Sequence, residues 1–342
     1  MNKIINLLLI TIFLSGCSFN KNSKFWTSDT LEELEEKKFE QIFADEKALS
    51  QEFNIDVNLN LGSNFTEASL INKLTNNDGR VNFDGSLKKS SKYKFSKIKN
   101  FYQFEPTISF NKNNIIFFDN KGTILQFDER SKLIWKKNYY SKAEKKLNPI
   151  LQLGNDGKSL VVADSLANYY MINLSNGELV WSKSNSAPFN SQIKIYKDRF
   201  FIIDFTNTLK CFSLKNGKEL WSFQTERSLI RSQKKLSIII LKDTVYFNNS
   251  LGDISAVNVN DGSLIWQLPT QKSQLYESSF SLETSDIITD EKNLFFSNNN
   301  NQFFSIDVNS GSFSWENSVN SNLRPTLVGN FLISISIEGY LI

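Results

Sequence analysis

The stretch Gly252-Asp-Ile-Ser-Ala-Val-Asn258, followed by Asp261-Gly262 and then Trp266, decides the fold, because the chain repeats this arrangement. A short apolar run, Val245-Tyr-Phe247 in this copy, comes before it. Glycine tolerates the positive φ of a tight turn, and Asp-Gly between two apolar runs is a strong hairpin signal. The stretch therefore predicts three consecutive antiparallel strands joined by two tight turns.

Five segments of the chain follow this pattern. The runs after the first turn and their tryptophans are Gly122–Asp128 with Trp135, Ala167–Asn173 with Trp181, Asn207–Ser213 with Trp221, Gly252–Asn258 with Trp266, and Asn301–Asp307 with Trp315. In the last four segments a glycine lies four residues before the tryptophan, at Gly177, Gly217, Gly262 and Gly311. In the first segment Ser131 takes that place, and the loop is one residue shorter.

The spacing of the repeats predicts the architecture. Successive tryptophans are 46, 40, 45 and 49 residues apart, which is the length of one four-stranded propeller blade. One such sheet cannot cover both of its faces, so the sheets must pack face to face around an axis, with each tryptophan in the gap between two blades. We expect an all-β protein with propeller blades over residues 96–342.

The C-terminal segment predicts an incomplete blade. Residues 330–342 stop inside a sixth repeat, just past the turn at Gly339. We expect about six blades in an open arc, in a chain truncated at its C-terminus. Residues 331–336 and 340–342 would then lie at or near an unpaired sheet edge.

The N-terminus has the order of a secretory leader. Lys3 precedes an apolar run, Ile4 to Leu14, that is too short to span a bilayer as a helix. Leu14-Ser-Gly-Cys17 then resembles the lipobox of bacterial lipoproteins. The resemblance implies a signal peptide over residues 1–16, cleavage before Cys17 and lipidation of the Cys17 thiol. Ser18, in place of an Asp, implies the outer membrane. The alternative is an ordinary secretory signal with a chance cysteine.

The segments between Cys17 and the repeats carry local signals. Residues 17–28 are polar and form the expected lipid tether. Thr30-Leu-Glu-Glu33 has the form of a capping box, and apolar residues then recur at helical spacing, so residues 29–52 are predicted as a short amphipathic helix. Residues 53–61 alternate apolar and polar side chains, as a strand does, and residues 53–95 are the lead-in with the first strand or strands.

The composition excludes much chemistry. The chain has no histidine, which removes the usual neutral-pH general base and histidine metal ligands. Lys and Arg total 39 against 36 Asp and Glu, without the basic stripe of a nucleic-acid binder. Cys211 has no partner once Cys17 is lipidated. Asp261 and Asp307 fall at turns, as does Leu153-Gly-Asn-Asp156. We expect no enzyme activity, no cofactor, no metal and no nucleic-acid partner.

The order of strand, Gly or Asn turn, strand, Asp-x-x-x-Gly, strand and Trp resembles the PQQ-repeat (quinoprotein-like) β-propeller family. Joined to the lipobox, the chain is similar to the BamB family of outer-membrane protein assembly lipoproteins over about residues 95–342. The resemblance implies an eight-bladed, lipid-anchored scaffold on the periplasmic face of the outer membrane. It also implies a partner, the periplasmic domains of a BamA-like barrel-forming subunit.

Two other functions remain open at this point. PQQ-dependent dehydrogenases share the repeat, but they use a vicinal cysteine pair, and this chain contains only Cys17 and Cys211. An envelope-anchored propeller that binds another ligand is the second alternative, because binding surfaces of propellers are built from variable loops.

Overall fold

The computed structural model describes residues 92–93, 108–111, 114–226, 234–270, 282–328 and 331–342. These residues belong to one compact unit, residues 61–342. The predictions for the signal peptide, Cys17, the lipid tether and the helix at 29–52 lie outside the described residues, as does nearly all of the lead-in at 53–95.

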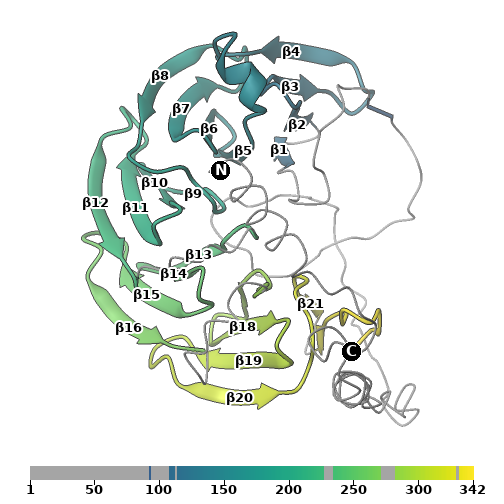
Figure 1. Cartoon of the computed structure of the whole chain (residues 1–342), viewed down its shortest axis with the longest axis vertical. Helices are drawn as coiled ribbons and strands as arrows, with labels where there is room; N and C mark the ends of the chain where they lie inside the picture. The colour runs from purple at the N-terminus through teal and green to yellow at the C-terminus, as the bar shows by residue number, and fades with distance from the viewer. Residues whose placement is uncertain (1–91, 94–107, 112–113, 227–233, 271–281, 329–330) are drawn as a thin grey trace, which may run out of the picture. The chain divides into compact units, whose positions relative to one another are not determined.

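Five four-stranded antiparallel sheets, each with its strands in chain order, make up most of the described residues (Figure 1). They are β1 (Ser109–Asn111), β2 (Asn114–Phe118), β3 (Ile124–Phe127) and β4 (Leu133–Lys137); β5 (Leu151–Asn155), β6 (Ser159–Asp164), β7 (Asn168–Asn173) and β8 (Leu179–Ser184); β9 (Lys194–Tyr196), β10 (Arg199–Ile203), β11 (Thr208–Ser213) and β12 (Glu219–Gln224); β13 (Ile238–Leu241), β14 (Thr244–Asn248), β15 (Ile254–Asn258) and β16 (Leu264–Leu268); β17 (Ile288–Thr289), β18 (Asn293–Asn298), β19 (Gln302–Asp307) and β20 (Phe313–Asn317).

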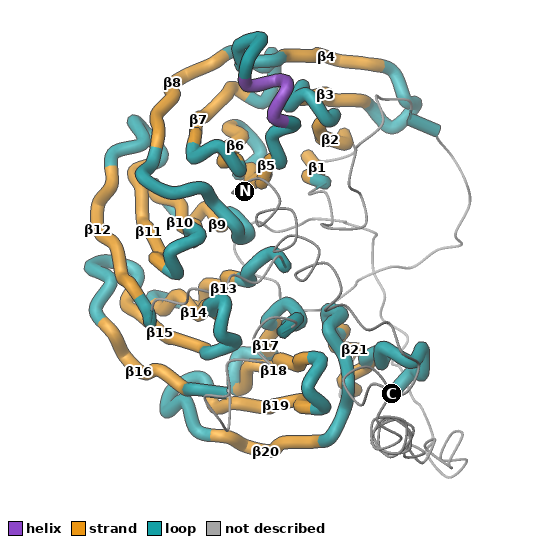
Figure 2. The backbone as a smooth tube through the Cα atoms, in the orientation of Figure 1, coloured by secondary structure: helices purple, strands orange, loops and turns teal. Residues whose placement is uncertain are grey.

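A sixth sheet begins with β21 (Thr326–Val328) and β22 (Phe331–Ile333). An isolated antiparallel bridge between Ile335 and Leu341 follows it in the chain. The helical content of the described residues is a single 3-10 turn, η1 (Glu144–Leu147), between the first two sheets (Figure 2). The predicted all-β propeller class is confirmed.

Burial distinguishes the strands within each blade. Strands such as β6 and β10 are buried along nearly their whole length, whereas the fourth strand, such as β8, is mostly exposed. The first strands of neighbouring sheets contact one another, as β5 does with β9 and β9 with β13. The first strand of each blade is therefore innermost and the fourth outermost, as a propeller requires.

The turn after each second strand has the backbone that the sequence predicts. Its last residue has a positive φ in each of the five blades: Gly122 (72°), Ala167 (70°), Asn207 (59°), Gly252 (88°) and Asn301 (56°). An Asp or Asn three residues earlier holds the turn, a role that the sequence pattern did not reveal. In the second blade, Asp164 Oδ1 accepts the N–H groups of Leu166 and Asn168, both at 2.8 Å. These bonds fix the loop so firmly that even alanine occupies the left-handed position.

The second turn differs from the two-residue turn that Asn-Gly suggests. Gly177 N–H donates to the carbonyl of Asn173 at 2.8 Å, so the turn begins four residues before the glycine. Gly177 has a φ of 69°, whereas Asn176 does not have a positive φ. A register shift follows between Met171 and Ile172, opposite the tryptophan strand. The strands also continue past the tryptophan, as β8 does to Ser184, rather than ending on it.

Gly154 does not lie where the sequence suggests. The prediction of a turn at Leu153-Gly-Asn-Asp156 is wrong, because Leu153 to Asn155 lie in β5. A Cβ at Gly154 would come within 2.8 Å of Ile193 Cγ2, on the segment leading into β9. Two innermost strands approach closely here, and glycine provides the space.

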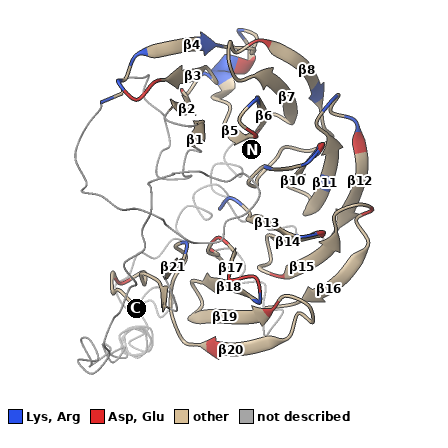
Figure 3. Ribbon diagram, turned by 180° about the vertical axis from the view of Figure 1, so that it is seen from behind, with Lys and Arg blue, Asp and Glu red and all other residues tan. Residues whose placement is uncertain are grey.

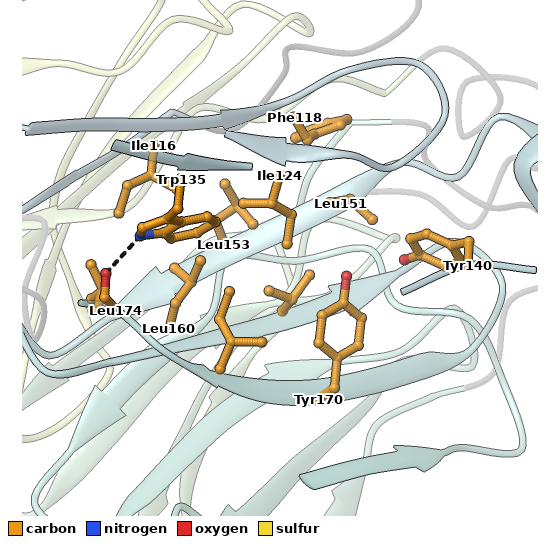
Figure 4. Packing of buried hydrophobic residues seen from close by; sticks show 12 residues of the cluster. Ile116, Phe118, Ile124, Trp135, Tyr140, Leu151, Leu153, Leu160, Tyr170 and Leu174 are labelled. Atoms are coloured by element: carbon orange, nitrogen blue, oxygen red, sulfur yellow. Dashed lines mark hydrogen bonds between the residues drawn. The ribbon is translucent and has the colours of Figure 1, made fainter. Parts of the chain in front are cut away.

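The tryptophans join one blade to the next, and Figure 4 shows this contact for Trp135. The indole N–H donates across the interface to a backbone carbonyl of the following blade. The pairs are Trp135 with Leu174 (2.9 Å), Trp181 with Leu214 (3.0 Å), Trp221 with Val259 (3.1 Å) and Trp266 with Val308 (3.0 Å). Each acceptor lies three residues before the glycine of the second turn.

The same glycine lies against the face of the indole. A Cβ on Gly177 would be 2.8 Å from Trp135 Cε3, and one on Gly262 would be 2.5 Å from Trp221 Cε3. Gly217 meets Trp181, and Gly311 meets Trp266, in the same way. Both the positive φ and the contact therefore require glycine, which explains why it is so regularly placed before the tryptophans.

Trp315 has a different environment. Its exposed fraction is 36%, against 7% for Trp135, and its ring packs on Phe295 and Phe303 of its own blade. None of the described residues accepts a hydrogen bond from the indole N–H of Trp315. A Cβ on Gly339, the next turn glycine that the structure describes, would meet no atom within 4 Å.

We predict that Trp181→Ala lowers the free energy of unfolding by ~3–5 kcal/mol, because it removes a large side chain and an inter-blade hydrogen bond. Trp315→Ala is the matched control and should cost ~1–2 kcal/mol, since the ring contacts one blade and is partly in solvent. Urea unfolding followed by fluorescence and circular dichroism measures both. Equal losses would show that docking onto the next blade contributes little.

Candidate functional site

The residues singled out in the sequence are placed in structural roles. Four tryptophans and their glycines lie at blade interfaces, as described above, whereas Trp315 packs on its own blade. Cys17 lies outside the described residues. Cys211 is fully buried in β11, and burial raises the pKa of its thiol to about 12, so it is not a reactive nucleophile. Asp261 and Asp307 accept turn hydrogen bonds, from Ser263 and Ser310 among others, which lower their pKa.

Hydrogen bonds between blades gather the innermost segments of the third, fourth and fifth blades. Gln192 N–H donates to Leu236 O, and Leu236 N–H donates to Asn190 O, both at 2.9 Å. Ile287 N–H then donates to Ser237 Oγ at 3.0 Å. These bonds fix the backbone that carries the charged residues around the axis.

Lys194 and the three charged residues that act on it electrostatically are called the axial cluster: Lys194 in β9, Lys235 before β13, Asp286 before β17 and Arg324 before β21. Lys194 interacts electrostatically with each of the other three. In Figure 3, blue segments beside β13 and β21 and a red segment beside β17 lie on the inner side of the sheets. Residues from four successive repeats therefore contribute to one site.

Lys194 is the unusual member of the axial cluster. Its exposed fraction is 8%, and it pairs with the fully buried Phe201 across β9 and β10. Burial lowers the pKa of the Lys194 ammonium to about 8; Asp286 opposes this shift, and Arg324 and Lys235 add to it. Among the ion pairs of the described residues, none includes Lys194.

Neighbouring contacts tie the axial cluster to the sixth repeat. Lys234 Nζ donates to the carbonyl of Asn322, and Asn322 Nδ2 donates to Glu283. Asn190 Nδ2 donates to the carbonyl of Lys234 at 3.2 Å. The segment before β21 is thus attached to the segments that lead into the fourth and fifth blades.

A second buried polar group, between the first and second blades, is structural. Tyr140 Oη donates to Asp164 Oδ2 at 2.6 Å, and the Asp164 carboxylate also holds its own turn. Burial is the largest influence and raises the pKa of Asp164, and burial likewise raises the pKa of Tyr140. Tyr140 lies against Gly122, where a Cβ would be 2.4 Å from the ring. The pair fills an inter-blade contact.

The sequence contained a weak signal for Lys194. In Ser191-Gln-Ile-Lys-Ile-Tyr196 a charged residue stands within an alternating apolar run, a position that normally faces solvent in a half-exposed strand. Only the packing of blades on both sides of β9 buries it. The described residues contain neither a cluster of three or more potential metal-binding side chains nor a helix long and apolar enough to cross a membrane.

The fold and its docked tryptophans define a β-propeller of the quinoprotein-like class. The family model described as outer membrane protein assembly factor BamB matches residues 120–342. The chain belongs to this family.

Individual relatives are distant. An uncharacterized protein of Rickettsia prowazekii (strain Madrid E), RP232, is 20% identical over 235 residues, which cover 65% of this chain and 55% of that protein. The chain thus matches little more than half the length of this curated relative.

Solved structures share the fold at low identity. BamB from Moraxella catarrhalis has a TM-score of 0.57 and 13% identity, over 70% of this chain and 71% of that one. The computationally designed Ika8 protein gives 0.56 and 12%, with coverage of 70% and 71%. The quinohemoprotein alcohol dehydrogenase ADHIIG from Pseudomonas putida HK5 gives 0.50 and 15%, over 63% of this chain and 42% of that one.

We predict that Lys194→Met stabilises the protein near neutral pH by as much as ~3 kcal/mol, because it removes a buried charge without an ion pair. The pKa of Lys194 is about 8 in the folded chain and 10.5 in the unfolded chain, so the folded state binds fewer protons between these values. Wild-type stability should therefore rise across this window relative to the variant.

Free energies of unfolding at both ends of the window measure the effect. Lys218→Met, at an exposed hairpin turn, is the control and should show no such dependence. A constant difference between wild type and Lys194→Met across this pH range would contradict the prediction.

Proposed function

We propose that the protein is a non-catalytic scaffold, anchored to the periplasmic face of the outer membrane by lipid on Cys17, that aids folding and insertion of outer-membrane β-barrel proteins. Its partner would be the periplasmic domains of a BamA-like barrel-forming subunit. The observation that carries the proposal is the match of residues 120–342 to the BamB family.

The N-terminal sequence supports the location. A basic residue, an apolar run of eleven residues and Leu14-Ser-Gly-Cys17 form the leader expected for a lipoprotein. Several acyl chains anchor a protein much more firmly than one, since each buried CH₂ contributes ~0.8 kcal/mol. A propeller held at the membrane in this way presents its loops to periplasmic partners.

The chemistry of the described site is consistent with a non-catalytic role. The axial cluster offers cations and one carboxylate, and its members come from four repeats. The likeness to the quinohemoprotein alcohol dehydrogenase concerns the fold. Cofactor binding would need groups beyond the repeat itself, and the whole chain has neither a histidine nor a vicinal cysteine pair.

We predict that Cys17→Ser abolishes incorporation of labelled palmitate and releases the protein from the membrane fraction. The reason is that the thiol is the acceptor of the diacylglycerol. Cys211→Ser is the matched control, because this thiol is fully buried, and it should keep its label. Equal labelling of the wild type and Cys17→Ser would disprove the anchor.

We further predict that the affinity-tagged chain, expressed in its own host and cross-linked before extraction, co-purifies with the barrel-forming subunit. An unrelated tagged lipoprotein of the same membrane is the control for abundance. Depletion of the chain should also lower the amounts of folded outer-membrane barrels. Recovery of the subunit at the level of the control, with unchanged barrels, would reject the scaffold role while leaving the anchor intact.

A further inference from the structure

We propose that Tyr93 is a latch on the far face of the first blade, in the position that a tryptophan of the preceding blade takes on each of the next four blades. The far face is the side of the first sheet that points away from the second blade. Its occupant is therefore this chain's own lead-in, rather than a second copy of the chain. The latch depends neither on the proposed scaffold role nor on lipid at Cys17.

The far face is defined by the alternation of side chains along β2 and β3. Ile116, Phe118 and Ile124 pack with residues of the second blade. Phe117 and Phe127 point the other way and stack on each other, with their ring centroids 5.4 Å apart. Both are only 7% exposed, so the far face is covered although it belongs to the first of the described blades.

Tyr93 contacts this face through its ring and its hydroxyl. The ring meets Phe127 edge to face, with 5.7 Å between the centroids, which is a favourable aromatic geometry. The hydroxyl donates to the carbonyl of Asp128 in a long hydrogen bond of 3.4 Å. Asp128 lies three residues before Ser131, and the carbonyls that accept the indole N–H groups lie three residues before the turn glycine in the next four blades. Tyr93 thus bonds the first blade where a tryptophan bonds the others.

Ser131 gives an independent argument for the same position. It has a φ of 64°, as the turn glycines do, but it carries a Cβ. In the next four blades a Cβ here would lie 2.5–2.8 Å from the indole of the preceding blade. A tyrosine has no second ring to fill that space, so serine is tolerated. Ser131 Oγ is nevertheless buried, which shows that this side of the turn is not open to solvent.

The same features favour the chain's own tyrosine over another copy as the occupant. A tryptophan from a second copy would need glycine at position 131 to dock as the other four tryptophans do. It would also compete with Tyr93 for the carbonyl of Asp128. Tyr93 already belongs to the cluster of Phe117, Leu125 and Phe127, so the occupant is part of the same chain.

The first test is photo-crosslinking of the full chain with p-benzoylphenylalanine in place of Tyr93, which puts a reactive ketone near the position of the hydroxyl. Illumination of a mixture of unlabelled and heavy-isotope-labelled protein should join position 93 to the peptide that holds Phe127 and Asp128, within one chain. The same amino acid in place of the exposed Tyr340 is the control and should not reach that peptide. Crosslinks between unlabelled and labelled chains would assign the far face to a second copy. Absence of a product on residues 115–128 would overturn the proposal.

The second test is hydrogen exchange followed by mass spectrometry. Tyr93→Ala should speed exchange of the amides in β3 and β4 about tenfold, because local opening of the first blade becomes easier. Strands β18 and β19 of the fifth blade should keep their protection. Tyr93→Phe removes only the hydroxyl and should have a smaller effect. Unchanged exchange in the first blade, or an equal rise in both blades, would show that Tyr93 is not a local latch.

The third test asks whether Tyr93 occupies the tryptophan position. Ser131→Gly relieves a left-handed backbone in any background, but it should raise the urea midpoint more in Tyr93→Trp than in the wild type, since only the indole needs the space of the Cβ. Circular dichroism confirms that each variant is folded. Equal gains in the two backgrounds would contradict the assignment. Failure to co-purify with the barrel-forming subunit would leave the latch untouched.

Discussion

The hydrogen bond from each tryptophan to the next blade, with a glycine against the indole face, is the constraint on which the fold depends. A sheet of four short strands has two apolar faces and cannot stand alone. The indole covers the outer part of one interface, and its N–H satisfies a carbonyl that the interface would otherwise bury, as for Trp221 and Val259. Tyrosine hydroxyls reinforce three of these contacts: Tyr139 donates to Gly177 O, Tyr169 to Gly217 O and Tyr246 to Val308 O, the last two at 3.1 Å. Because the contact recurs at nearly constant spacing, each repeat is positioned by its neighbour.

This dependence explains how much of the fold could be predicted from the sequence. A tryptophan and a glycine four residues before it are visible in the chain, as are apolar runs such as Phe200–Ile203, which lies within β10. The positive φ of Asn207 and Asn301 was also predictable, because few residues other than Gly and Asn tolerate it. The ends of the strands and the type of the second turn could not be predicted. Asn176-Gly177 is compatible with two different turns, and the bulge beside Met171 selects between them.

The axial cluster could not be predicted for a different physical reason. Lys194 lies in an alternating run of the kind found in a strand with one solvent-exposed face. The side chain is nevertheless buried, because blades pack on both sides of β9. Its neighbours Asp286 and Arg324 are about 90 and 130 residues away in sequence, so no local pattern connects them. Repeat signals specify how blades stack, whereas positions that differ between blades specify what the axis can bind. In this class of protein, binding function therefore depends on the positions whose residues differ from one repeat to the next.

The outermost strands of the first two blades combine exposed apolar side chains with lysines. The two residues before a tryptophan are commonly apolar and exposed, such as Leu133 and Ile134 at 44% and 45%. These strands are also sheet edges, with backbone groups available for pairing with another chain. In β4 the tryptophan is followed by Lys136 and Lys137, and Lys183 holds a similar position in β8. Lysine on an edge strand discourages edge-to-edge pairing, because a second copy would bring like charges together. A propeller that presents such edges can remain separate from other copies of itself while its loops and its axis stay available for binding.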